Sequence, residues 1–455
     1  MSPSEYLEWI KNNKHLKTVA SHHDTFSLTD VAMRAGGADT AVYLKHPELQ
    51  LRMRRGLTFL HSGDHLEVAR QGLPKFFDLE LEEQEKEIKD FQFPITLYNL
   101  EKLNGENAQI SYSKFIGKWI ICSKNVAIAV ESLQEAEEKY SKEQRFSFAL
   151  YIARHWFNGC VPQIKHIDDL KQFLDSNTLV GEVCDVSQNQ HIVDNPQRQG
   201  FIAFAIVTKA PSGPGTPLCT MPNEAVPIFE KFAIPHVDAG ESCVVSSRAE
   251  FPKLETFVEK LTVDASPDPY VCLSEGSVVY AVDRNGKVLF LAKVKTNKYR
   301  ILRRVRELMK NLATPKANDP SSAMKSRTRF RADLKKWGFH DSASIDAYML
   351  LYDACDHVRK THQKGKEDVG RWFIDFLHSA ISEIKAGRVR LTAPTVDVPE
   401  EEEPAANGPS DKAKVQRKRR NRGRRGKKAL EPESSEGEDK EFAALPGDVN
   451  VKTFN

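Results

Sequence analysis

The sequence predicts an α+β fold over about the first 310 residues, in which antiparallel sheets pack against flanking helices. Short, often continuous apolar runs bounded by Gly, Asn, Asp or Pro are typical of strands that are buried against helices. Charged helical stretches, such as 81–91 and 132–157, lie among them. Asn285-Gly286, between two of the runs, predicts a hairpin turn. The predicted strands lie in 118–123, 178–185, 201–208, 277–283 and 288–295.

The pattern changes after this region. Apolar residues recur at spacings of three and four between 319 and 392, with no strand-like alternation, which predicts a small all-helical domain of three or four helices. From 393 to 455 the chain is dominated by Pro, Glu, Ser, Lys and Arg and has almost no aromatic residues, so we expect disorder there. The predicted organisation is therefore a mixed domain over 1–310, a helical domain over 319–392 and a charged tail over 393–455.

The charge of the chain is concentrated in that tail. The net charge is +3, yet the segment 412–428 holds eleven Lys or Arg residues and no acid, which leaves −8 for the remainder. A partner that is a polyanion is therefore indicated by one segment and not by the whole protein. The segment could hold RNA through its phosphates, act as a nuclear import signal, or be a solvated charged tail.

Composition excludes several classes of protein. Apolar content of 40% and charged content of 28% are typical of a soluble globular protein. No stretch approaches the roughly 18 uncharged apolar residues that span a bilayer, and the first residues do not resemble a secretion signal. We expect no membrane partner and an intracellular protein of the nucleus or cytoplasm. The seven cysteines are spread out and never form a Cys-x-x-Cys pair, so neither a disulfide framework nor a zinc ribbon is predicted.

A series of short motifs points to phosphate chemistry. Lys293 and Lys295 are two residues apart on a predicted strand and so share one face, which is unfavourable unless an anion lies between them. Together with other cations they could hold a triphosphate. The motifs, in chain order, are Arg55-Gly56-Leu57-Thr58-Phe59, Lys75-Phe76-Phe77-Asp78, Lys114-Phe115-Ile116-Gly117 and then Lys124, residues 180–185 with His191-Ile192-Val193, Glu275-Gly276, and Lys293-Val294-Lys295 with Tyr299.

Two carboxylates and one lysine could complete such a site. Glu182 and Glu275 could accept hydrogen bonds from ribose hydroxyls and contact a hydrated magnesium ion. Lys114, crowded by cations and partly desolvated, would lose its proton more easily and could attack an α-phosphorus. Alternatively, Lys114 is a solvated lysine at a strand end.

The ordered set resembles the covalent nucleotidyltransferase superfamily, an ATP-grasp-like ligase fold. Within it, the set is similar to the RNA ligases of the phage and fungal tRNA-ligase type. The resemblance covers roughly residues 50–305 and rests on RGLTF, KFFD, KxxG, GEVCD with HIVDN, EG and KVKTNKY. It implies ATP and Mg²⁺ as cofactors and RNA, above all tRNA or its fragments, as the partner. The implied reaction joins an RNA 5′-phosphate to a 3′-hydroxyl through a lysyl-AMP and an adenylylated RNA end.

The resemblance also implies roles for individual residues. Lys114 would be the adenylylated nucleophile, Glu182 the ribose contact and Glu275 the metal-linked or adenine-side carboxylate. Some of the cations would bind the α-phosphate and the others the outer phosphates. For Tyr299, a contact with substrate and a packing role both stay open. Lys293 and Lys295 are expected on the α-phosphate, and Arg55, Lys75 and Lys124 on the outer phosphates.

One departure from the family pattern leaves a rival function open. Most relatives have Asp or Asn before the motif glycine, whereas Ile116 occupies that position. The rival is a noncatalytic RNA-binding protein on a degenerate ligase fold. No Gly-x-x-x-x-Gly-Lys-Ser/Thr loop is present, so any healing of RNA ends is expected to need a separate enzyme. The layout further suggests that the helical domain selects RNA, and a monomer is expected.

Overall fold

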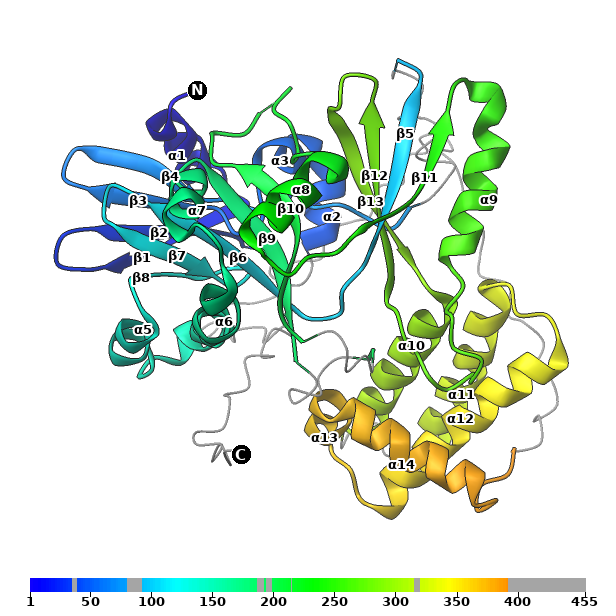
Figure 1. Cartoon of the computed structure of the whole chain (residues 1–455). Coiled ribbons are helices and arrows are strands. Elements are labelled where there is room, and N and C mark those ends of the chain that lie inside the picture. Colours follow the sequence, from blue (N-terminus) through cyan, green and yellow to red (C-terminus); the bar gives the residue numbers. More distant parts are fainter. Residues whose placement is uncertain are drawn as a thin grey trace, which may run out of the picture. The chain divides into compact units, whose positions relative to one another are not determined.

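The computed structural model describes residues 1–34, 39–79, 92–185, 192–193, 199–213, 215–314 and 320–391 (Figure 1). Its strands form three antiparallel sheets that are covered by helices, which confirms the predicted α+β class. Three sequence predictions fall outside the described residues: the helix at 81–91, the position of His191, and the tail 393–455 with its basic run 412–428.

The first sheet has the order β1-β2-β3-β4 and is built from the N-terminal part of the chain. Helix α1 packs on it through Tyr6, Leu7 and Ile10, which share a core with Phe59. The connection between β2 and β3 carries helices α2 and α3 and leads to Arg55. The elements are α1 (Pro3–Asn12), β1 (Leu16–His22), β2 (Ser27–Met33), α2 (Asp39–Lys45), α3 (Pro47–Arg52), β3 (Thr58–Ser62) and β4 (His65–Arg70).

The second sheet has the order β10-β9-β6-β7-β8. A large apolar core, with Trp119, Trp156 and Phe201, joins it to four helices. In its register Asn107 of β6 is paired with Glu182 of β9. The strands are β6 (Glu106–Ser113), β7 (Lys118–Cys122), β8 (Ala127–Val130), β9 (Asn177–Cys184) and β10 (Gly200–Thr208), and the helices are α5 (Leu133–Tyr140), α6 (Ser147–His155), α7 (Ile167–Leu174) and α8 (Pro222–Phe232).

The third sheet has the order β11-β5-β12-β13 and faces the second through an apolar core shared by Val180, Ile202 and Tyr280. The hairpin predicted at Asn285-Gly286 is present between β12 and β13. Helix α9 packs on the other face through Leu254 and Phe257. The elements are β5 (Ile95–Glu101), β11 (Ala239–Val245), α9 (Phe251–Leu261), β12 (Gly276–Asp283) and β13 (Val288–Lys295).

Helices follow the third sheet. Their apolar faces form one core that includes Leu302, Phe330, Tyr352 and Phe373. Helix α10 belongs to this core and residues 1–391 lie in one compact unit, so a separate helical domain over 319–392 stays a prediction. The helices are α10 (Asn297–Leu312), α11 (Pro320–Lys336), α12 (Ser342–Thr361), α13 (Lys366–Arg371) and α14 (Phe373–Lys385).

Gly276, which follows Glu275 at the start of β12, is required by the backbone. Its φ is +138°, and a Cβ there would lie 2.0 Å from the carbonyl oxygen of Val294 on β13. We expect Gly276→Ala to destabilise the protein by more than about 3 kcal/mol, since backbone strain and overlap add. Gly117→Ala, at φ +67° with open space around its Cβ, should cost about 1 kcal/mol. Urea unfolding of both variants measures this difference, and equal midpoints would contradict it.

Candidate active site

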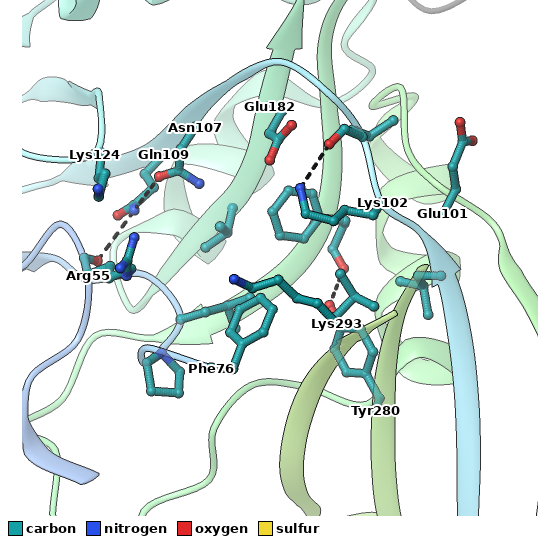
Figure 2. Close-up of a pocket in the computed structure, with 17 residues that line it drawn as sticks. Arg55, Phe76, Glu101, Lys102, Asn107, Gln109, Lys124, Glu182, Tyr280 and Lys293 are labelled. Atoms are coloured by element: carbon teal, nitrogen blue, oxygen red, sulfur yellow. Dashed lines mark hydrogen bonds between the residues drawn. The ribbon is translucent and has the colours of Figure 1, made fainter. Parts of the chain in front are cut away.

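A pocket of about 840 Å³, partly open to solvent, lies between the second and third sheets (Figure 2). Apolar side chains form much of its wall, and charged side chains enter from both ends. The apolar lining is Leu73, Pro74, Phe76, Leu100, Leu103, Val180, Phe204, Val278 and Tyr280, and the polar lining is Arg55, Glu101, Lys102, Asn107, Gln109, Lys124, Glu182 and Lys293.

Lys102 lies at the centre of the charged groups. It directly follows β5, and its Nζ is 2.8 Å from Oε1 of Glu275, which is 5% exposed. Glu182 projects from β9 toward the same ammonium (Figure 2). Lys102 is thus ion-paired with Glu275, which precedes β12, and lies close enough to Glu182 of β9 to feel its charge.

The segment after Lys102 binds both carboxylates, one through a backbone amide and the other through a side chain. The amide nitrogen of Gly105 donates a hydrogen bond of 2.8 Å to Oε2 of Glu182, and Nδ2 of Asn104 donates one of 2.8 Å to Oε2 of Glu275. Gly105 must be glycine, because a Cβ there would lie 2.4 Å from the carbonyl oxygen of Val183. The segment 102–105 therefore supplies the amine and orients its two partners.

The electrostatics of this group favour a charged lysine in the ligand-free protein. Burial acts to lower the pKa of Lys102, but the carboxylates of Glu182 and Glu275 outweigh it and hold the pKa above its ordinary value. Burial raises the pKa of Glu182 to about 7, against the opposing effect of Lys102. Glu182 therefore titrates near neutral pH.

The raised pKa of Glu182 predicts a pH-dependent stability. The folded protein keeps this proton up to about pH 7, whereas the unfolded chain loses it near its ordinary pKa of 4.5, so the free energy of unfolding falls as pH rises between these values. The difference corresponds to about 3 kcal/mol. We expect Glu182→Gln to lack this decline. Urea unfolding of both proteins at about pH 5 and pH 8 tests it, and parallel pH profiles would contradict it.

Lys293 and Lys295 share one face of β13, as predicted, but differ in their surroundings. Nζ of Lys293 lies 5.3 Å from the centre of the Phe76 ring, and no carboxylate among the described residues is within ion-pair distance of it. Burial, together with the charge of Lys295, lowers the pKa of Lys293 to about 8. Lys295 is neutralised by Asp78 at 3.0 Å. Figure 2 shows Lys293 reaching into the pocket.

The opposite end of the pocket is formed by Arg55 and Lys124 (Figure 2). Nη2 of Arg55 is 3.0 Å from Oδ2 of Asp39, and Nζ of Lys75 is 2.9 Å from Oδ1 of the same carboxylate. Lys75 adjoins the lining residues Pro74 and Phe76. Three cations predicted from the sequence to act together are thus grouped at one end.

Tyr299 lies outside the pocket lining but close enough to Glu275 and Lys102 for their charges to act on the pKa of its hydroxyl. It is 5% exposed and packs in the core of the C-terminal helices, where burial raises its pKa to about 12. It is not among the residues that line the pocket, and the substrate contact that the sequence left open stays a prediction.

A magnesium ion is compatible with the carboxylates of the pocket. Within the described part of the chain, no group of three or more His, Cys, Asp or Glu side chains is arranged to hold a metal on its own. Mg²⁺ is commonly bound by one or two carboxylates together with substrate phosphates. Glu182 lines the pocket and could supply one such carboxylate, whereas Glu275 lies behind Lys102 and is not among the lining residues.

We expected Lys114 to share a site with the two glutamates, but the structure does not bring it together with them. Lys114 lies at the exposed tip of the β6–β7 hairpin, and its amide nitrogen donates to Asp175. Glu182 pairs with Asn107, seven residues back along β6 from Lys114, which at about 3.3 Å per residue is about 23 Å. No lysine side chain spans that distance.

The sequence contained a signal that was missed. Lys102-Leu103-Asn104-Gly105 is also a Lys-x-x-Gly motif, and it has Asn before the glycine, as the resemblance requires. It directly follows the strand β5, which was not among the predicted strands. With Lys102 as the motif lysine, Asn104 takes the position before the glycine, and the departure from the family pattern at Ile116 no longer arises.

A family model described as RNA ligase matches residues 53–299, more than half of the chain. The chain belongs to the RNA ligase family. This confirms the resemblance and an RNA substrate. The matched range contains every lining residue of the pocket but not Asp39. No curated protein sequence matches the chain.

Solved structures of ligases are similar to this RNA ligase at low sequence identity. An archaeal ATP-dependent RNA ligase has a TM-score of 0.44 and 13% identity, over 85% of this chain and 80% of that one. A putative ATP-dependent DNA ligase from Aquifex aeolicus has a TM-score of 0.42 and 15% identity, over 84% and 80%. A Naegleria gruberi RNA ligase solved with ATP and Mn has a TM-score of 0.33 and 16% identity, over 50% and 56%.

Within the described residues, no helix is long and apolar enough to cross a membrane.

Proposed function

We propose that this RNA ligase is ATP-dependent and forms its lysyl-AMP on Lys102. The observation that carries the proposal is the buried Lys102–Glu275 ion pair, with Glu182 beside it, in a pocket lined by further cations. An amine is the nucleophile, the carboxylates control its proton, and the cations hold phosphates. Lys114 is too far from these groups to take the same role.

The first step would be attack of the Lys102 amine on the α-phosphorus of ATP. A phosphorus–nitrogen bond forms, the bond from that phosphorus to the bridging oxygen breaks, and pyrophosphate leaves. The ammonium must first lose a proton, which its two carboxylates disfavour in the ligand-free state. If Glu182 bound the ribose and Glu275 a hydrated magnesium ion, the two carboxylates would no longer stabilise the charged ammonium. Burial would then lower the pKa of Lys102.

The remaining steps use the same pocket. AMP is transferred from Lys102 to the 5′-phosphate of an RNA, and the 3′-hydroxyl of a second RNA end then displaces AMP to form the phosphodiester bond. Lys293 is directed into the pocket and has no carboxylate of the described residues within ion-pair distance, so it would balance the charge that develops on the α-phosphate, with Lys295 next to it. A magnesium ion, when bound, would add further charge stabilisation.

The RNA substrate is proposed to be a cleaved tRNA or tRNA fragment, bound partly by the C-terminal helices. Helix α11 supports this, because Lys325, Arg329 and Lys336 are exposed and lie on one face of it. Such a row of cations suits an RNA backbone. Ends that carry the wrong phosphates would have to be healed by a separate enzyme.

The rival function, a noncatalytic RNA-binding protein, loses its main support. It was motivated by Ile116 in the Lys-x-x-Gly motif that begins at Lys114. The motif that enters the pocket begins at Lys102 and has Asn104 in the same position. Asn104 is also engaged, since it donates to Glu275 and accepts from the amide nitrogens of Ile192 and Val193.

The test is covalent labelling followed by transfer. Purified protein is incubated with magnesium and ATP or GTP labelled at the α-phosphate, and then with 5′-phosphorylated RNA. We expect label from ATP that survives denaturation and moves to the RNA, faster for a cleaved tRNA than for an unstructured oligonucleotide. Absence of label from folded protein, shown by intact mass not to carry AMP already, would contradict the ligase proposal and favour the rival.

A further inference from the structure

Asp39 directly contacts two of the three cations at the end of the pocket formed by Arg55 and Lys124. Asp39 is 9% exposed, and its two carboxylate oxygens are divided between Arg55 at 3.0 Å and Lys75 at 2.9 Å. Its side chain and that of Lys75 are both less than 15% exposed. This is a built, buried contact and not a surface ion pair of the kind that contributes little.

The backbone independently brings the two cations together. Arg54 and Pro74 form a β-bridge, and the amide nitrogen of Arg55 donates 3.0 Å to the carbonyl oxygen of Leu73. Gln50 also donates to the carbonyl oxygen of Lys75, at 2.9 Å. Asp39 is therefore not needed to hold these segments in place, and its carboxylate acts on the side chains.

The charge of Asp39 opposes the binding of phosphates. Arg55, Lys75 and Lys124 lie near one another and near this acid, and Asp39 reduces their summed charge from +3 to +2. Any phosphate held by Arg55 and Lys75 must compete with the carboxylate that already accepts their hydrogen bonds. Weaker binding of an anion at this end favours its departure.

We propose that Asp39 is a positioning residue that limits how tightly the pocket retains pyrophosphate. This rests on the proposed function, in which pyrophosphate leaves from the end of the pocket lined by Arg55 and Lys124. Asp39 aims the two side chains at the outer phosphates of ATP and, once the bond to the α-phosphorus breaks, replaces pyrophosphate as their partner. The leaving group is released, and reversal of adenylylation is suppressed.

The experiment compares variants of the full chain that change the charge of Asp39. Asp39→Asn keeps one acceptor oxygen without the charge, Asp39→Ser removes both carboxylate oxygens, and Asp39→Glu keeps the charge. We expect the inhibition constant of pyrophosphate for adenylylation to fall about tenfold in the two neutral variants and to stay near wild type in Asp39→Glu. The KM for ATP should fall with it, while kcat falls because product is retained.

Two controls separate this from a loss of fold or of the ligase activity itself. Asp356→Asn removes an acid that likewise accepts from one arginine and one lysine, Arg359 and Lys360, but lies on α12, and it should leave pyrophosphate inhibition unchanged. Ligation of chemically adenylylated RNA, which releases no pyrophosphate, should be equal in all variants. Unchanged or weaker pyrophosphate inhibition in both neutral variants would overturn the inference alone, whereas a wild-type protein that takes no label would overturn the proposed function and the inference with it.

Discussion

Replacing Lys102 with alanine is expected to reduce covalent labelling by ATP at least about 10³-fold, to background. The reason is that Lys102 is the one lysine of the described pocket lining that is ion-paired with a carboxylate of the described residues, and loss of a nucleophile removes the covalent step outright. Lys114→Ala, at the exposed hairpin tip, should retain labelling within about twofold of wild type. Quantified label after denaturing electrophoresis, at matched protein concentrations, measures both.

A control is needed because Lys102→Ala leaves Glu182 and Glu275 without their cation. Joining of chemically adenylylated RNA does not require the nucleophile, so the variant should still catalyse this step and thereby show that it is folded. Label that persists in Lys102→Ala and disappears in Lys114→Ala would show that the nucleophile had been misplaced.

Lys293→Ala is expected to have the second largest effect, a loss of about 10²-fold or more in the rate of adenylylation. A partly buried cation aimed at the place where charge develops contributes far more than one in water. Lys295→Ala should cost only about tenfold, because Asp78 already neutralises this lysine. Single-turnover rates at saturating ATP measure the effect on the chemical step.

Lys293→Arg provides the matched comparison. It keeps the positive charge, so partial activity between wild type and Lys293→Ala is expected if charge at this place is what matters. Equal losses in Lys293→Ala and Lys295→Ala would contradict the distinction that the structure makes between the two residues.

Much of the site could be predicted because several motifs are short and local. Period two along a strand was sufficient to place Lys293 and Lys295 on one face, and the family resemblance pointed to Glu182 and Glu275. The Asn285-Gly286 turn likewise needed only local information. The α+β class followed from the lengths and boundaries of the apolar runs.

The nucleophile could not be fixed in the same way, because its selection depends on register between distant segments. Two Lys-x-x-Gly segments lie 12 residues apart, and only pairing of β6 with β9 shows that Glu182 is opposite Asn107, close to Lys102 and far from Lys114. Asp39 was missed for a related reason. It meets Arg55 and Lys75 through tertiary contacts and belongs to no motif.

The central claim, that Lys102 carries AMP, is tested most directly by locating the modified residue. Wild-type protein is incubated with ATP and magnesium, digested, and its peptides are sequenced by mass spectrometry under conditions that preserve the phosphorus–nitrogen bond. We predict the mass of one AMP on Lys102 and an unmodified Lys114. AMP on Lys114, or on any other residue with Lys102 unmodified, would contradict the account.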